Sequence, residues 1–217
     1  MRFLVTAGPT REPIDPLRYL SNRSSGKMGY AIAAAAIEAG HDVILISGPV
    51  CLDPPSEAEL TFVTTADQMF DAVHRHVKNC DILVMCAAVA DYKPALASKD
   101  KIKKQNANLS IELSPTRDIL SSFPPEHREF FVVGFAAETT DLHKNAQKKL
   151  RAKNCDAIVA NDVGSPNSGM ESDENEVTIF FPDGQIQEIS RTSKKNVARE
   201  LVKIFAKMCE KRLTKKM

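Results

Sequence analysis

The 217-residue chain has no excess of charge, because its 29 lysines and arginines are matched by 28 aspartates and glutamates, which leaves a net charge of +1. A protein with so little net charge has no overall field that would attract nucleic acid or an anionic membrane, so any basic site must be local. The sequence also lacks an apolar stretch of membrane-spanning length and a secretory signal at its N-terminus. We therefore expect a cytoplasmic protein that binds neither nucleic acid nor membrane.

Cysteine is scarce and scattered. The five cysteines show no CxxC pair and no Cys/His spacing typical of a metal site; they are Cys51, Cys80, Cys86, Cys155 and Cys209. We expect reduced thiols that mostly pack in the interior. His74 and His76 are two residues apart and lie on different sides of a predicted helix, so we expect surface histidines rather than a metal pair.

Two nucleotide-binding motifs are missing. No glycine stands five residues before Gly26, and Met28 occupies the place of the Ser or Thr that a Walker loop requires. There is no GxGxxG, and the second predicted strand ends at Ser47-Gly48 without an acidic residue for a ribose. Together with the absence of a Tyr-x-x-x-Lys pair, this counts against a nicotinamide-binding reductase. That activity, or a nucleotide sensor, stays an alternative from a different class.

The N-terminal stretch is the most informative part of the sequence. Residues 3–7 form an apolar run that predicts a buried strand, which stops at Gly8. A long polar loop without regular structure is expected next, and Gly26 to Gly29 then open an alanine-rich helix. A loop of this length is more often functional than not. Because a helix N-terminus offers free N–H groups and the positive end of a dipole, this turn suits a phosphate.

The rest of the chain alternates between apolar strands and amphipathic helices, which predicts an α/β fold: a Rossmann-like, doubly wound, mostly parallel sheet in a single domain over residues 1–217. Further strands are expected at 43–47, 60–65, 81–88, 130–138 and 155–162, and helices at 66–79, 141–154 and about 193–212. The strand at 81–88 is the most continuously apolar and should be central. Thr65 and Gln68 predict a capping box, Asp141 predicts a helix cap, and residues 176–189 predict an antiparallel edge hairpin.

Residues 95–113 interrupt this rhythm with a cluster of lysines. The segment predicts a lysine-rich flap that ends in an alternating strand at 109–113, and Lys101 lies within it. Because the chain as a whole has no charge excess, the cluster favours phosphate binding over a merely solvated face. Residues 115–118 are expected to open a short helix, and residues 164–176 to form a lid or a disordered segment.

Position in the sheet suggests further site residues. The carboxyl ends of parallel strands share one edge, which would bring Ala87, Ala88 and Asp91 next to the glycine turn. Asp91 could bind a hydroxyl or a metal, or equally cap a turn. Phe135 is better explained as core than as a stacking surface for a base, and Lys149 and Lys153 share a helix face.

Five motifs in this order closely resemble the bacterial phosphopantothenate–cysteine ligase, also called phosphopantothenoylcysteine synthetase: TAGPTREPIDPLRYLSNRSSGKMG, CAAVADYKP, KIKK, VGFAAET and IVANDV. The resemblance covers nearly the whole chain. It implies that CTP activates the carboxylate of 4′-phosphopantothenate as an acyl-cytidylate, with release of pyrophosphate, and that the amine of L-cysteine then displaces CMP. The same ligase using ATP stays an alternative.

The resemblance also implies roles for individual residues. Asn22 looks like the asparagine that holds the acyl intermediate, and Lys101 like the flap lysine that contacts the triphosphate; these two are the catalytic candidates. The acyl substrate would also contact Ala87, Ala88 and Asp91. The nucleotide would contact Gly8, Ser24, Ser25, Gly26, Gly29, Asp91, Lys101, Thr116, Asp118, Phe135, Lys149 and Lys153. Mg²⁺ is implied by the triphosphate, although no dedicated metal cage is visible apart from Asp91.

Two departures from the family are visible. Where the family has a proline before the aspartate of the flap-to-helix turn, this chain has Arg117, between Thr116 and Asp118. The flavin-dependent decarboxylase half that many relatives carry is absent from the sequence, so we expect a stand-alone ligase without FMN, and a separate decarboxylase acting next. Family members dimerise, and a homodimer through the loop around Arg18 or through the edge hairpin is expected.

Overall fold

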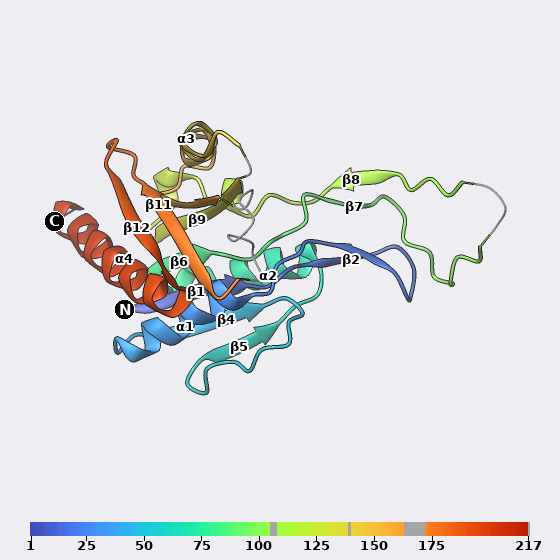
Figure 1. Cartoon of the computed structure of the whole chain (residues 1–217), viewed down its shortest axis with the longest axis horizontal. Coiled ribbons are helices and arrows are strands. Elements are labelled where there is room, and N and C mark those ends of the chain that lie inside the picture. The colour runs from blue at the N-terminus through green and yellow to red at the C-terminus, as the bar shows by residue number, and fades with distance from the viewer. Residues whose placement is uncertain (105–107, 139, 163–171, 217) are drawn as a thin grey trace.

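The structure is a computed structural model that describes residues 1–104, 108–138, 140–162 and 172–216. Its centre is an eight-stranded sheet with the order β12-β11-β10-β9-β6-β1-β4-β5 (Figure 1). These strands are β1 (Arg2–Ala7), β4 (Asp42–Ser47), β5 (Glu59–Phe62), β6 (Ile82–Met85), β9 (Phe131–Glu138), β10 (Ala157–Asp162), β11 (Glu174–Phe180) and β12 (Ile186–Ser193). β11 pairs antiparallel with both β10 and β12 at one edge, and the other pairings of this sheet are parallel. The predicted Rossmann-like fold, its edge hairpin and the central place of β6 are confirmed.

Helices cover both faces of the sheet. One core lies between the sheet and the helices α1 (Lys27–Glu38) and α4 (Lys194–Lys216), and the other lies under α2 (Ala66–His76) and α3 (Leu142–Ala152). Along β1, Phe3 and Val5 face the first core and Leu4 faces the second, all fully buried. A strand buried on both faces needs apolar residues in succession, which explains the continuous runs in the sequence.

Two short antiparallel ribbons form an arm that projects from the sheet (Figure 1). The first ribbon pairs β2 (Arg11–Pro13) with β3 (Tyr19–Ser21), and the second pairs β7 (Tyr92–Pro94) with β8 (Leu113–Pro115). We call the described residues of 11–21 and 92–115 the arm. At its root, the buried Glu12 accepts a hydrogen bond at 2.8 Å from the backbone N–H of Ala66, in the first turn of α2.

Asp15 joins the two ribbons. Its carboxylate, at the turn of the first ribbon, accepts hydrogen bonds from the N–H groups of Leu17, Arg18 and Ile102 and from the guanidinium of Arg18. The backbone N–H of Ser98 donates to the carbonyl of Ile14 at 2.9 Å. The hydrogen bond from Arg18, followed by those from the backbone, holds the pKa of Asp15 well below its usual range, so the carboxylate is ionised at neutral pH.

Three sequence predictions for the loops were wrong. The loop after β1 is not irregular, because β2 and β3 pair within it; strands of three residues are too short to show an alternating pattern. The strand expected at 109–113 is found instead at β8, because its partner β7 faces residues 113–115. Residues 115–118 do not open a helix: the chain continues as far as Asp118 without helix and forms only the 3-10 turns Leu120–Ser122 and Pro125–His127.

The predictions for α2 and α3 agree better with the structure than those for the loops. The capping box of Thr65 and Gln68 is confirmed, although α2 ends at His76 and Val77–Asn79 form a 3-10 turn. Asp141 precedes α3 as expected, but its left-handed backbone (φ 49°) leaves no side-chain capping bond. His74 is not a surface histidine, because it is half-buried and stacks between Phe70 and Phe123.

The five cysteines are free thiols, as predicted. Burial raises the pKa of Cys80, Cys86 and Cys155 to about 12, so these thiols are protonated and inert at neutral pH. Most of the lid predicted at 164–176 lies outside the described residues.

Candidate active site

A cavity of about 520 Å³ opens at the carboxyl ends of β1, β6, β9 and β10. The chain leaves β1 towards β4 on one side and leaves β6 towards β9 on the other, so the cavity lies where the strand order reverses. Ligands of open α/β sheets bind at this place. The cavity gathers thirteen of the residues predicted to form the site: Asn22, Ser24, Ser25, Gly26, Gly29, Ala87, Ala88, Asp91, Thr116, Asp118, Phe135, Lys149 and Lys153.

One wall is the N-terminus of α1. Gly26 caps the helix in the left-handed conformation (φ 78°), and a Cβ there would lie 2.8 Å from Val50 Cγ1. The hydroxyls of Ser24 and Ser25 accept hydrogen bonds from the N–H groups of Gly26 and Lys27. The turn therefore presents hydroxyls and helix amides to the cavity, a combination suited to an anion.

Gly29 lets α1 lie directly against β1. A Cβ at this position would come within 2.6 Å of the Ala7 Cβ and 3.0 Å of its Cα. We expect Gly29→Ala to destabilise the protein by about 1 to 3 kcal/mol, because the helix must move away from the strand. Urea unfolding of the two proteins measures this difference. Gly40→Ala is the control for loss of a glycine, since a Cβ there meets nothing within 4 Å although its φ of 79° carries a backbone cost of its own. Equal stability of wild type and Gly29→Ala would contradict the packing argument.

The floor is the turn Ala87–Asp91, which buried threonines hold in place. The backbone N–H of Ala87 donates to Thr6 Oγ1 at 3.1 Å, and that of Ala90 donates to Thr10 Oγ1 at 2.9 Å. Ala88 continues the β1–β6 pairing, because its N–H donates to the carbonyl of Gly8. The side-chain amide of Asn22 donates to the carbonyl of Ala88 at 3.1 Å, which fixes Asn22 over this turn.

The opposite wall comes from β9 and α3. Lys149 Nζ donates to the carbonyl of Phe135 at 2.7 Å, and burial holds the pKa of this lysine below its usual value. Lys153 forms an ion pair with Asp118 and reaches Ser121 Oγ at 3.2 Å. Burial opposes ionisation of Asp118, but the hydrogen bonds from Lys153 and Ser121 outweigh it and lower its pKa. Both predicted lysines therefore face the cavity beside Phe135.

Sequence reasoning missed a second group of cationic and amide side chains. Lys27, Asn161, Asn175 and Lys194 line the cavity on the side of α1 and α4. Lys194 is only 7% exposed, and burial followed by the charge of Lys27 lowers its pKa. In the sequence it is one lysine of a basic pair at the start of a helix, and only tertiary structure places it inside.

Two predicted residues are not part of the cavity lining. Gly8 lies behind the cavity wall, where its carbonyl accepts a hydrogen bond from the N–H of Ala88. Its Cα would lie 3.4 Å from a Cβ added at Gly26. Lys101 is exposed on the arm, next to Ile102, whose backbone N–H donates a hydrogen bond to Asp15. The structure of the single chain therefore does not bring Lys101 together with the other candidates.

No metal cage is evident in the described part of the chain, since His, Cys, Asp and Glu do not gather there in groups of three or more. Of the carboxylates in the cavity, Asp118 is taken up by Lys153, whereas Asp91 is exposed at the mouth. A single carboxylate beside substrate phosphates is a common way for proteins to hold Mg²⁺. None of the helices within the described ranges has a stretch that could traverse a bilayer.

A family model and several curated proteins match this chain. The family model of the DNA/pantothenate metabolism flavoprotein C-terminal domain matches residues 1–208. The coenzyme A biosynthesis bifunctional protein CoaBC of Bacillus subtilis is 48% identical over 94% of this chain and 50% of its own length, and that of Escherichia coli K12 is 47% identical over 85% and 46%. The chain spans about half the length of the curated relatives it matches.

Solved structures agree in fold. The crystal structure of the C-terminal domain of a CoaBC bifunctional protein is 43% identical, with a TM-score of 0.83, and the match covers 97% of this chain and 96% of that one. A mutant of Cab2 in complex with phosphopantothenate-cysteine has a TM-score of 0.80 at 16% identity, which shows a shared fold. With the family model matched almost from end to end, this chain belongs to the family of the DNA/pantothenate metabolism flavoprotein C-terminal domain.

Proposed function

We propose that this chain is a phosphopantothenate–cysteine ligase of coenzyme A biosynthesis that uses CTP. A carboxylate oxygen of 4′-phosphopantothenate attacks the α-phosphorus of CTP and pyrophosphate leaves. The amine of L-cysteine then attacks the carbonyl carbon of the acyl-cytidylate, CMP leaves, and the amine proton is released. The observation that carries the proposal is one cavity in which Asn22, the Ala87–Asp91 turn and two separate cationic walls meet. Family membership favours this ligase over a reductase.

Two anionic substrates would need two cationic regions. We assign the nucleotide to the wall of Phe135, Lys149 and Lys153, where an aromatic side chain and two lysines lie together. The amide- and hydroxyl-rich turn at α1, with Lys27 and Lys194, is then left for the phosphate of phosphopantothenate. This assignment moves Ser24, Ser25, Gly26 and Gly29 from the nucleotide to the acyl substrate. Asn22 would lie between the two, over the reacting carbonyl.

Asp91, together with the nucleotide phosphates, would hold Mg²⁺, which neutralises phosphate charge when bound. The protein's own part is to orient the carboxylate and to keep water away from the acyl-nucleotide. Asn22 would donate a hydrogen bond to the carbonyl oxygen as negative charge develops there. It is already oriented by the carbonyl of Ala88.

The test is pyrophosphate release from CTP with phosphopantothenate, measured with and without cysteine. Pyrophosphate formed without cysteine, and amide formed only with it, would support the two-step ligase. ATP at equal concentration tests the choice of base, and faster turnover with ATP would overturn the assignment of CTP. No pyrophosphate under any of these conditions would contradict the proposed function.

Lys194 offers a separate test of the phosphate assignment. We expect Lys194→Gln to raise the KM for phosphopantothenate about tenfold and to change the KM for CTP much less, because a buried cation is lost at one end of the cavity only. Lys195→Gln is the matched control, since its side chain is 65% exposed and pairs with Glu38. A larger change in the KM for CTP would reverse the assignment.

We also propose a homodimer formed through the arm. Its described residues expose many large apolar side chains, which a single chain leaves in water: Leu17, Tyr19, Tyr92, Leu96, Leu109, Ile111 and Leu113. Exposed apolar clusters of this kind mark association surfaces. In such a dimer the arm of one protomer would carry its Lys101 to the cavity of the other, where this lysine would contact the triphosphate.

A further inference from the structure

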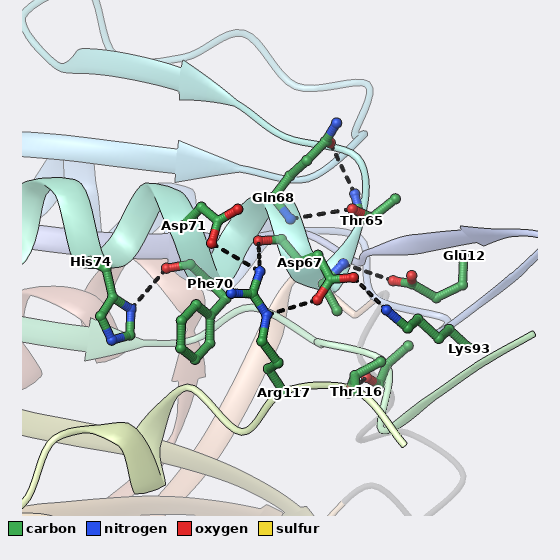
Figure 2. Close-up of polar contacts among 12 residues, drawn as sticks. Glu12, Thr65, Asp67, Gln68, Phe70, Asp71, His74, Lys93, Thr116 and Arg117 are labelled. Carbon is green, nitrogen blue, oxygen red and sulfur yellow. Dashed lines mark hydrogen bonds and ion pairs between the residues drawn. The ribbon is translucent and has the colours of Figure 1, made fainter. Parts of the chain in front are cut away.

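The outer face of α2 holds Arg117 by several contacts (Figure 2). Arg117 Nε donates to Asp67 Oδ1 at 2.8 Å, and Nη2 donates to the backbone carbonyl of Asp67 at 3.0 Å and contacts Asp71 Oδ1 at 2.9 Å. The guanidinium carbon lies 4.0 Å from the centre of the Phe70 ring. Arg117 is thus fixed at once by charge, by hydrogen bonds and by stacking.

The carboxylate of Asp67 is shared with a second cation. Its other oxygen, Oδ2, accepts a hydrogen bond from Lys93 Nζ at 2.5 Å (Figure 2). Lys93 belongs to β7, and Arg117 follows two residues after β8 ends. These strands are paired, so one carboxylate in the first turn of α2 fastens both strands at the end that lies next to the cavity. The hydrogen bonds from Lys93 and then Arg117 hold the pKa of Asp67 below its usual range.

The segment that Arg117 anchors forms part of the cavity wall. The hydroxyl of Thr116 donates to the carbonyl of Ala90 at 2.6 Å, and its N–H donates to the carbonyl of Asp91 at 2.9 Å. Asp118 binds Lys153. All three residues line the cavity, but Arg117 binds α2, whereas Thr116 binds the floor and Asp118 binds the far wall.

The contacts continue along α2 beyond Arg117. Phe70 stacks on His74 with ring centres 4.1 Å apart, and His74 stacks on Phe123 at 4.6 Å. His74 Nε2 also lies 3.2 Å from the hydroxyl of Ser122. The chain from Arg117 to Phe123 is therefore held to α2 at both of its ends.

We propose that Arg117 is a positioning residue of the ligase site, which keeps Thr116 and Asp118 in register with the Ala87–Asp91 turn by fastening the chain between them to α2. The inference rests on the proposed function, and it concerns the nucleotide, because Asp118 meets Lys153 on the wall assigned to CTP. Proline would restrict this backbone directly, whereas Arg117 restricts it through the contacts of its side chain with α2. Asp67 is the common anchor.

The experiment compares Arg117→Ala, Asp67→Asn and the double variant with wild type. Arg199→Ala is the matched control, because both arginine side chains are 44% exposed and ion-paired, and Arg199 pairs with Glu38 on the α1 and α4 side of the sheet. We expect Arg117→Ala to raise the KM for CTP about tenfold and the dissociation constant for CTP equally, with the KM for phosphopantothenate within about twofold of wild type. The double variant should raise the KM for CTP by less than the product of the two single effects, because both substitutions remove the ion pair of Arg117 with Asp67, although each also removes a contact of its own, with Asp71 or with Lys93.

A purely structural role would lower the melting temperature without changing the KM for CTP. If Arg117→Ala fails to fold, Arg117→Lys replaces it, with an expected rise in KM of about threefold, because lysine keeps the charge and loses the forked hydrogen bonds. An active wild type whose KM for CTP is unchanged in the Arg117 variants overturns the inference. A wild type without pyrophosphate release overturns the proposed function instead.

Discussion

Asn22→Ala is expected to lower amide formation by about 100- to 1,000-fold, the usual cost of losing one hydrogen-bond donor to a developing oxyanion. Pyrophosphate release should stay measurable, because the first step attacks phosphorus and does not need a donor at the acyl carbonyl. The acyl-cytidylate should therefore accumulate. Rapid quenching followed by mass spectrometry of the acyl-nucleotide would detect it.

The reason for such selectivity lies in the position of Asn22. Its amide is exposed at the cavity mouth and is oriented by the Ala88 carbonyl, so its removal leaves no cavity in the core. Asn79→Ala is a suitable control, since Asn79 is an exposed asparagine in the 3-10 turn after α2. Loss of both half-reactions together in Asn22→Ala would show that Asn22 acts in binding or folding instead.

The second large effect is expected for Lys101→Gln. We expect pyrophosphate release to fall about 100-fold, because a lysine at the triphosphate stabilises charge that the first step develops. Lys99→Gln, a change at an exposed lysine of the same arm, should leave the rate within about twofold of wild type. An unchanged rate for Lys101→Gln would remove Lys101 from the site.

Mixed dimers would show whether Lys101 acts in the cavity of its own protomer or in that of the partner protomer. A dimer with Asn22→Ala in one protomer and Lys101→Gln in the other, purified through two different tags, has one intact site if Lys101 acts across the interface. Its rate should then be about half that of wild type, since one of two symmetric sites survives. If Lys101 served its own cavity, each site would keep one substitution and the mixed dimer would be no faster than the two parent variants.

The central sheet was predictable because burial on both faces leaves a strong mark on the sequence. The strands β1, β4, β6 and β9 are continuous apolar runs, and their order follows from the connecting helices and glycine turns. The cavity was predictable for the same reason, since parallel strands end at one edge. Residues that follow these strands directly, such as Ala87 and Asp91, were therefore found.

The arm and the second cationic wall were not predictable. Strands of only three residues carry no periodic signal, so the sequences of β2 and β3 look like a loop. The partner of β8 is set by hydrogen bonds to a distant segment rather than by local alternation. Lys194 lies among exposed residues in the sequence, and only the meeting of α4, β11 and α1 buries it. The contacts of Arg117 with α2 were not predictable either, because its partner Asp67 lies fifty residues earlier in the chain.

The hydrogen bonds of the Asp15 carboxylate hold the two ribbons of the arm together. Because this carboxylate joins segments that are more than eighty residues apart in sequence, the two ribbons form one unit rather than two independent hairpins. The arm is attached to the first turn of α2 by the hydrogen bonds of Glu12 and Lys93, and the same helix turn binds the cavity wall through Arg117. The arm and the cavity wall thus share one point of attachment, and a substitution at Asp67 is expected to loosen both.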